Sequence, residues 1–141
     1  FAKNNVFFDQ LFCLYPTSPL RNSTDIQKIS TILNDKEETK AVMAVTNYFY
    51  YPYQAMILNK KGFLEPFWDD LIRKNSIDLP EFYVDNGSTY AIKINTFTKE
   101  KTFYPKSGLV PYKMDKLRSI DIDTKEDLDF LEGISKISNH N

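Results

Sequence analysis

Two carboxylates near the C-terminus have a spacing that could serve metal chemistry. Asp121 and Asp123 lie one residue apart in segment 119–124, which reads Ser-Ile-Asp-Ile-Asp-Thr. In a β-strand, residues two apart point to the same face, so the carboxylates would lie about 7 Å apart. Like charges on one face repel unless a cation, a basic side chain or a proton intervenes. Mg²⁺ often binds one or two carboxylates together with a substrate phosphate, so the pair is a candidate metal and catalytic site.

The same segment also fits the start of a helix. Asp123 and Thr124 are both good N-cap residues, and Thr124 with Asp127 makes an acidic variant of the capping box. Taken alone, the spacing favours this cap over a metal site. The two roles are compatible, because Asp121 could bind a metal while Thr124 caps the helix.

A second polar segment, at residues 15–21, reads Tyr-Pro-Thr-Ser-Pro-Leu-Arg. Its two prolines stiffen the loop, because each fixes φ and removes a backbone donor. Ligands in α/β proteins usually bind at such strand-end loops. Thr17 and Ser18 offer hydroxyl groups, and Arg21 offers a charge suited to carboxylate or phosphate. A polar connection that caps the next helix explains this loop equally well.

A third polar segment, Asp85–Ser88, is predicted to be a turn. Gly87 would permit a positive φ or the close approach of a ligand, and Asn86 could hydrogen-bond a sugar hydroxyl. Turn-forming residues before a strand are common, so this segment alone favours a plain turn.

The hydrophobic pattern predicts an α/β sheet that positions these segments. Residues 11–15 form an apolar run that ends at a proline, and residues 41–45 form a second buried strand. A helix between them begins near residues 22–24, with Ile26, Ile29, Ile32 and Leu33 on one face. Strand, helix and strand at this spacing make a βαβ unit, which predicts a mostly parallel sheet.

The rest of the chain divides into an excursion and a return to the sheet. Residues 48–85 are rich in aromatic side chains, with a hairpin expected at 56–64 and helical spacing at 67–72. Further strands are expected at 89–94, 109–114 and 120–123, followed by a helix from Lys125.

Composition excludes several classes of protein. The 141 residues fit one domain, and the net charge of −1 comes without a basic block for nucleic acid. The single cysteine, Cys13, lies in an apolar run and is expected to be a buried, inert thiol. No apolar stretch of membrane-spanning length appears, so we expect no membrane partner and a cytoplasmic protein.

Four motifs in order resemble the acylneuraminate cytidylyltransferase family. The family carries a Gln-Pro-Thr-Ser-Pro-Leu-Arg loop, a strand ending Val-Thr, an Asn-Gly turn before a Tyr-containing strand, and a final Asp-Ile-Asp-Thr. This chain has corresponding residues at 15–21, 42–46, 86–90 and 120–124. The match covers nearly the whole chain, and its strength lies in the order of four individually weak motifs.

The resemblance implies a three-layer, Rossmann-like fold and a defined reaction. Such enzymes join CTP to a nonulosonic acid (sialic, legionaminic or pseudaminic acid), giving CMP-sugar and pyrophosphate. It implies that Asp121 and Asp123 hold Mg²⁺, and that residues 48–85 are a dimerisation arm of a homodimer, lending residues to the partner's sugar pocket. The implied sugar-binding residues are Tyr15, Thr17, Ser18, Arg21, Asn86, Gly87, Tyr90, Phe103 and Tyr104.

Departures from the family pattern bear on the sugar. Tyr15 replaces a sugar-contacting Gln, a feature of the pseudaminic branch, and residues 52–55 and 78–80 lean the same way. Residues 16–18 are closer to the sialic and legionaminic pattern. Val84 stands where sialic acid enzymes tend to have an arginine, which leaves Arg73 as a candidate partner for the sugar carboxylate.

The largest departure is the absence of the family's first strand and its basic, glycine-containing loop for CTP phosphates. The chain begins at Phe1, so we expect a C-terminal portion that does not turn over CTP alone. The alternatives are a non-catalytic remnant that binds sugar or forms dimers, and an unrelated α/β binding domain whose Asp-Ile-Asp is only a helix cap.

Overall fold

A computed structural model describes residues 7–138, apart from the side chains of Ser76, Ile137 and Ser138. The chain divides into two compact units. The first unit combines Phe1–Thr46 with Asp85–Asn141 and carries the sheet, and the second is Asn47–Val84. Each unit is described by itself below.

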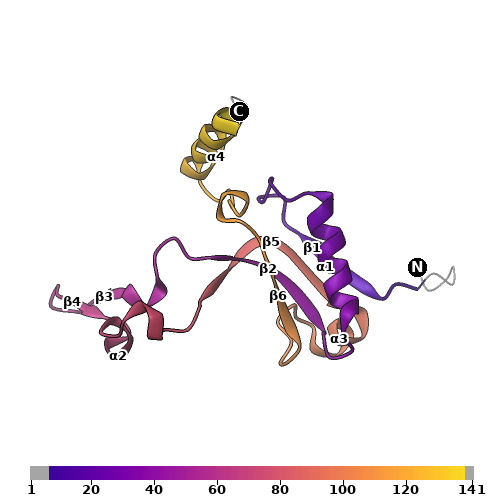
Figure 1. The fold of residues 1–141 in the computed structure, drawn as a ribbon, viewed down its shortest axis with the longest axis horizontal. Helices are drawn as coiled ribbons and strands as arrows, with labels where there is room; N and C mark the ends of the chain where they lie inside the picture. The colour runs from indigo at the N-terminus through magenta and orange to yellow at the C-terminus, as the bar shows by residue number, and fades with distance from the viewer. Residues whose placement is uncertain (1–6, 139–141) are drawn as a thin grey trace. The chain divides into compact units, whose positions relative to one another are not determined.

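Strands of the first unit form a mixed sheet with the order β1-β5-β2-β6 (Figure 1). β1 is antiparallel to β5, with Cys13 opposite Tyr90, whereas β2 is parallel to β6, with Val42 opposite Val110. The strands are β1 (Gln10–Leu14), β2 (Ala41–Asn47), β5 (Tyr83–Lys93) and β6 (Leu109–Lys113).

The α/β class is confirmed, but the expectation of a mostly parallel sheet is corrected. Although one helix links β1 to β2 along the chain, β5 lies between them in the sheet. Burial accounts for this order: every residue of 86–92 in β5 is buried, as is every residue of 41–46 in β2. Strands with two covered faces occupy the middle, and the half-exposed β1 and β6 form the edges.

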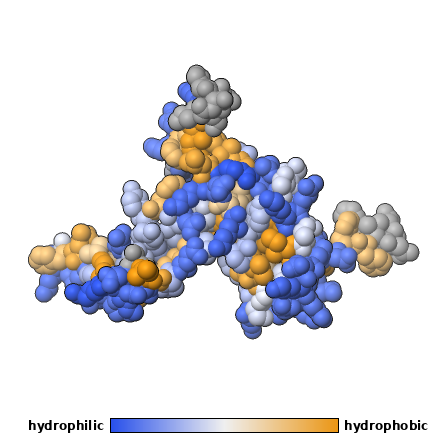
Figure 2. All heavy atoms as spheres, in the orientation of Figure 1, coloured by the Kyte–Doolittle hydropathy of each residue, from blue (hydrophilic) through white to orange (hydrophobic). Residues whose placement is uncertain are grey.

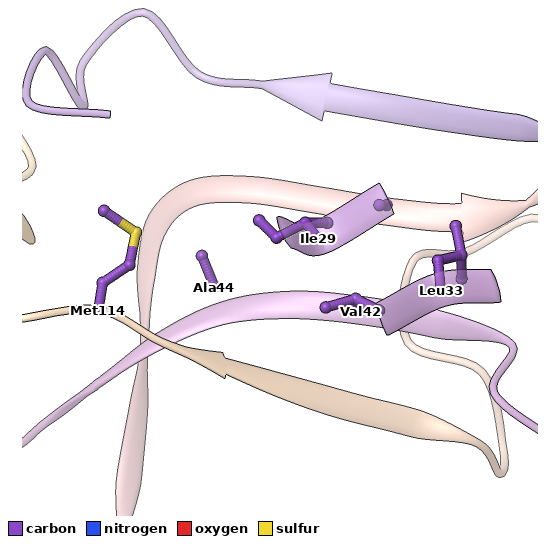
Figure 3. Packing of buried hydrophobic residues seen from close by; sticks show 6 residues of the cluster. Ile29, Leu33, Val42, Ala44 and Met114 are labelled. Atoms are coloured by element: carbon purple, nitrogen blue, oxygen red, sulfur yellow. The ribbon is translucent and has the colours of Figure 1, made fainter. Parts of the chain in front are cut away.

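Helix α1 (Ser23–Asp35) begins where the sequence predicts and covers the middle of the sheet. Asn22 is its N-cap, and its side chain accepts from the Asp25 N–H while the Asp25 carboxylate accepts from the Asn22 N–H. The apolar face then packs into the core cluster shown in Figure 3, which consists of Ile29, Leu33, Val42, Ala44, Ala91 and Met114.

Three further elements of the first unit are α3 (Ile94–Glu100), the 3₁₀ turn η4 (Lys116–Arg118) and α4 (Lys125–Ser138). Helix α3 was not predicted, because the strand pattern of the sequence continues to Ile94, where the helix begins. Lys101 ends α3 in the left-handed conformation, with φ of 56°. Helix α4 carries apolar side chains on its surface (Figure 2), among them Leu128 and Phe130.

The second unit contains the predicted hairpin. β3 (Met56–Leu58) and β4 (Leu64–Pro66) pair antiparallel, and the Asn59 side chain accepts from the Lys61 and Phe63 N–H groups in the turn. Figure 2 shows apolar side chains at the surface of this hairpin. Its remaining elements are η2 (Pro52–Gln54), α2 (Asp69–Ile72) and η3 (Ser76–Asp78). Its role as a dimerisation arm stays a prediction.

Within residues 7–138, no helix is long and apolar enough to cross a membrane.

The core of the first unit predicts a contrast between two leucines. Leu33 is 0% exposed, and Leu117 in η4 is 58% exposed. Leu33→Ala leaves a cavity between α1 and the sheet, so we expect a loss of about 2–5 kcal/mol in unfolding free energy, measured by urea denaturation. Leu117→Ala removes the same atoms from the surface and should cost less than about 1 kcal/mol. Equal losses would contradict this account of the core.

Candidate functional site

Asp121 and Asp123 lie in a loop between η4 and α4, not in a strand as predicted. One backbone hydrogen bond ties this loop to a neighbouring segment, from the Ile122 N–H to the Thr17 carbonyl at 2.9 Å. Because there is no strand, the alternation that would place both carboxylates on one face is lost. Asp121 is half-buried and Asp123 is exposed.

The helix cap predicted at this point is confirmed. The Asp127 Oδ2 atom accepts from the Thr124 N–H at 2.8 Å, and the Asp127 N–H donates to the Thr124 hydroxyl at 3.3 Å. Hydrogen bonds from the Thr124 hydroxyl and N–H lower the pKa of the Asp127 carboxyl. Thr124 and Asp127 therefore make the cap, which leaves the Asp121 and Asp123 carboxylates outside it.

The Asp121 carboxylate rests on the backbone of Gly87 in β5. A Cβ atom added at Gly87 would overlap Asp121 Oδ2, so any other side chain there must displace this carboxylate. The other oxygen, Asp121 Oδ1, is buried and has no hydrogen-bond partner in the structure. A buried carboxylate oxygen without a donor is costly, and a cation is one way to satisfy it.

Residues 85–88 do not form the predicted turn, because they lie inside the long strand β5. Gly87 has φ of 66°, which bends the strand locally. Two side chains accept from backbone N–H groups two residues on: Asp85 Oδ1 from Gly87 at 3.0 Å, and Asn86 Oδ1 from Ser88 at 3.1 Å. These local bonds explain how turn-forming residues can sit within a strand.

Asn86 joins buried segments instead of facing an open pocket. It is 5% exposed, and its Nδ2 atom donates to the Ser119 hydroxyl at 2.9 Å. Its backbone carbonyl accepts from the buried Ser18 hydroxyl at 3.5 Å. Asn86 and Ser18 thus link the proline loop, β5 and the turn before Asp121.

Arg21 has a similar joining role. One guanidinium nitrogen, Nη1, donates to the Ser88 carbonyl at 2.6 Å and to the Tyr15 carbonyl at 3.1 Å. Arg21 therefore fastens the proline loop to β5 next to the Gly87 bend. The structure thus brings together the three polar segments at residues 15–21, 85–88 and 119–124.

Four of the predicted sugar-binding residues share one pocket. Tyr15, Tyr90, Phe103 and Tyr104 line it together with Cys13 and Thr102, and its volume is about 280 Å³. That volume suits a substituent of a ligand better than a whole drug-sized molecule. The ring of Tyr90 is central, with its centroid 5.5 Å from Tyr15, 5.9 Å from Phe103 and 6.4 Å from Tyr104. The Cys13 thiol is half-buried, not fully buried as predicted.

Both phenol hydroxyls at this pocket donate to one carboxylate oxygen. The Tyr90 and Tyr104 hydroxyls lie 2.7 Å and 2.6 Å from Asp85 Oδ2. The hydrogen bond to Asp85, together with burial, raises the pKa of Tyr104 to about 12. Burial is the main cause that raises the pKa of Tyr90, followed by its hydrogen bond to Asp85. The sequence pattern indicates the segment that contains Asp85 but gives no role to Asp85 itself.

An ion pair between the buried Asp25 and the partly exposed Arg118 was not predicted from the sequence. The Arg118 guanidinium donates to Asp25 Oδ2 and to the Leu20 carbonyl, and the Tyr112 hydroxyl donates to Asp25 Oδ1 at 2.9 Å. Burial would raise the pKa of Asp25, but hydrogen bonds from Arg118, the Asn22 N–H and Tyr112 outweigh it and lower this pKa. In sequence, Asp25 gives only the signal of a capping box.

Arg73, the candidate partner for a sugar carboxylate, belongs to the second unit. Its guanidinium pairs with the exposed Asp69 at 2.7 Å, four residues earlier on the chain. No observation tests whether Arg73 binds a sugar carboxylate, so that role stays a prediction.

The acidic loop offers at most a two-carboxylate metal site. Across the part of the chain that the structure describes, no group of three or more His, Cys, Asp or Glu side chains is placed to hold a metal ion. Mg²⁺ needs only one or two protein carboxylates where a substrate phosphate completes its shell. The unpartnered Asp121 Oδ1 fits such an ion. Asp123 donates its N–H to the Asp127 carboxylate of the cap, but its own exposed carboxylate is not part of the cap.

The predicted resemblance to cytidylyltransferases that activate a nonulosonic acid is confirmed by two relatives. The chain is 29% identical over 135 residues to the pseudaminic acid cytidylyltransferase of Campylobacter jejuni serotype O:2, covering 95% of this chain and 57% of the relative. The enzyme of the same name from serotype O:23/36 is 28% identical over the same shares. The chain thus spans little more than half the length of these relatives, and no family model matches it.

The contact between Gly87 and Asp121 predicts a coupled pair of mutations. Gly87→Ala must strain a positive φ and displace the Asp121 carboxylate, so we expect a loss of about 2–4 kcal/mol in unfolding free energy. Gly62→Ala is the matched control, because Gly62 has φ of 83° and nothing within 4 Å of an added Cβ. It should cost only the backbone strain, about 1–2 kcal/mol.

A double-mutant cycle with Asp121→Ala isolates the contact. Removing the carboxylate leaves room for the new methyl group, so Gly87→Ala should cost less in the Asp121→Ala background, by about 1 kcal/mol or more. Independent, additive losses would show that the carboxylate does not rest on Gly87.

The Asp25–Arg118 pair predicts a specific pH dependence. Arg118→Gln leaves a buried carboxylate without its cation and should lower the unfolding free energy near neutral pH by about 2–3 kcal/mol. The pKa of Asp25 is lowered from 3.8 in the folded state, so its contribution is present above pH 3.8 and is lost as the pH falls through the lowered value. The difference in unfolding free energy between the parent chain and Arg118→Gln should therefore become smaller at acid pH.

Denaturant unfolding at several pH values checks this expectation. Lys125→Gln, which removes an exposed charge at the start of α4, serves as the control and should leave the curve nearly unchanged. If the difference in unfolding free energy between the two chains stays constant down to the lowest pH, an ion pair at Asp25 is contradicted.

Proposed function

We propose that this chain is the sugar- and metal-binding part of a cytidylyltransferase that activates a nonulosonic acid. The observation that carries the proposal is the buried, unpartnered Asp121 Oδ1, held on the same bent strand that supplies Tyr90 to the aromatic pocket. The names of the two relatives support the reaction class.

In the proposed reaction, the anomeric hydroxyl oxygen of the sugar bonds to the α-phosphorus of CTP. The bond between that phosphorus and the pyrophosphate oxygen breaks, and the hydroxyl proton is lost to a base. Bound Mg²⁺ would neutralise charge that develops on the phosphate oxygens. Asp121 and Asp123 are the residues that would hold it.

The chain's own residues would mainly position the sugar. Gly87 admits the Asp121 carboxylate to the surface of β5, and Arg21 fastens the proline loop beside it. Rings of Tyr15, Tyr90 and Phe103 offer an apolar wall suited to a methyl-bearing substituent. Holding the reacting hydroxyl in place supplies much of the advantage in such transfers.

Among nonulosonic acids, we infer pseudaminic acid as the substrate. Tyr15 stands at the loop position where the sialic acid enzymes carry Gln, and its ring packs 5.5 Å from Tyr90 in the pocket. Both relatives carry pseudaminic acid in their names. Homodimerisation through residues 48–85 and a cytoplasmic location remain parts of this proposal.

The alternative function is a sugar-binding or dimerising remnant without chemistry. The unpartnered Asp121 Oδ1 favours the enzyme, because a protein with no metal to bind gains nothing from an unsatisfied buried carboxylate oxygen.

Asp121→Asn in the active enzyme that contains this chain tests the proposal. We expect the formation of CMP-pseudaminic acid from CTP and pseudaminic acid to fall at least about a hundredfold, because the amide loses the charge that holds the cation. Mn²⁺ affinity, followed by electron paramagnetic resonance, should fall as well. Asp129→Asn, which removes an exposed carboxylate on α4, should change neither.

Unchanged turnover and Mn²⁺ affinity in Asp121→Asn would refute the metal role. The isolated 141-residue chain should release no pyrophosphate with Mg²⁺, CTP and pseudaminic acid. Measurable release would contradict the expectation that the phosphate-binding part lies elsewhere.

A further inference from the structure

Asp85 lies where the aromatic pocket meets the bend that carries Asp121. Its two carboxylate oxygens accept three hydrogen bonds, from the Gly87 N–H to Oδ1 and from the Tyr90 and Tyr104 hydroxyls to Oδ2. The donors come from β5 and from the segment after α3, which are separate in sequence. One side chain thus sets both the shape of the strand bend and the position of two pocket rings.

We propose that Asp85 is a positioning residue of the sugar pocket, which holds Tyr90 and Tyr104 in place beside the bend that carries the Asp121 carboxylate. The inference rests on the proposed function, since it assigns a role within that same site. This role differs from that of a metal ligand, because protein donors already engage both oxygens of Asp85.

Asp85 is itself held in place by the backbone of Gly87. The bond from its N–H to Asp85 Oδ1, at 3.0 Å, stabilises the positive φ at this residue. The same glycine leaves the space that Asp121 Oδ2 fills. Gly87 therefore contacts both Asp85 and the Asp121 carboxylate of the acidic loop.

Asp85 in turn holds the two phenols. Each tyrosine hydroxyl has one proton to donate, and Asp85 takes both. The hydroxyl oxygens can then only accept from a ligand, so the pocket edge selects a substituent that presents an N–H or O–H donor. Tyr90 is 8% exposed and is fixed by the surrounding rings, whereas Tyr104 is 57% exposed and depends more on Asp85 for its position.

Asp85→Asn tests the proposal with little change of shape. The amide oxygen can still accept from Gly87, but its nitrogen cannot accept from a phenol, so both tyrosine hydrogen bonds must break or reverse. Tyr104→Phe is the second variant, since it removes one donor and keeps the ring. Asp129→Asn, an exposed carboxylate on α4, is the matched control for charge.

Two readouts on the full chain separate the possible failures. One is the NMR spectrum of ring-labelled tyrosine, which reports the Tyr90 and Tyr104 hydrogen bonds without any ligand. The other is the affinity for pseudaminic acid, measured by calorimetry. We expect Asp85→Asn to shift both tyrosine signals and to weaken sugar binding about tenfold, with a smaller loss in Tyr104→Phe and none in Asp129→Asn.

Tyrosine signals that stay unchanged in Asp85→Asn would overturn the proposal, because the hydrogen bonds would not exist. Shifted tyrosine signals with unchanged sugar affinity would also overturn it, since Asp85 would then be structural only. A parent chain that does not bind pseudaminic acid, with tyrosine signals that respond as expected, would instead refute the proposed function on which the role depends.

Discussion

The ion pair between Asp25 and Arg118 is the interaction on which the candidate site depends. Asp25 is 1% exposed, and a buried carboxylate is stable only with charged or hydrogen-bonded partners. Arg118 supplies the charge from η4 and also donates to the Leu20 carbonyl at the end of the proline loop. The start of α1, the proline loop and the turn before Asp121 are thereby held at one point, and the bond from Ile122 to Thr17 follows from that arrangement.

Polar groups of strand β5 also have hydrogen-bond partners from neighbouring segments. Asn86 bonds Ser119, the Ser88 carbonyl accepts from Arg21, and Asp85 accepts from two tyrosines. In this network the buried side-chain oxygen without a partner is Asp121 Oδ1. An unsatisfied atom within a well-satisfied network calls for an explanation, and a bound cation explains it with the residues present.

The periodicity of apolar residues correctly predicted the helices and strands that bury a clear apolar face. The apolar pattern predicted the positions of α1 and β2 closely, because the apolar residues Ile29, Leu33 and 41–45 are all buried. The α3 helix was missed, since Ile94 continues a strand pattern and no cap residue announces a helix there. The place of β5 between β1 and β2 was not predictable from the connection of α1, because order in a sheet is set by which strands have two covered faces.

The sequence predicted which residues belong to the site better than it predicted how they are arranged. Family motifs selected the proline loop, Gly87, Asp121 and the aromatic pair, and the structure brings their segments together. The strand expected at Asp121–Asp123 is a loop, and the turn expected at Asn86–Gly87 is a bend inside a strand. Arg118 and Asp25 are 93 residues apart, so no local pattern could pair them. Asp85 likewise acquires its role only when the fold brings Tyr104 to it.

The central claim is that the Asp121 carboxylate, seated on Gly87, is a divalent-cation site. A crystal structure of the active enzyme that contains this chain, grown with Mn²⁺ and CTP and with anomalous scattering used to locate the ion, tests it most directly. The account predicts an anomalous peak within coordination distance of Asp121 Oδ1, with Gly87 beneath the same carboxylate. Mn²⁺ bound elsewhere, with Asp121 Oδ1 hydrogen-bonded to a protein donor, would contradict it.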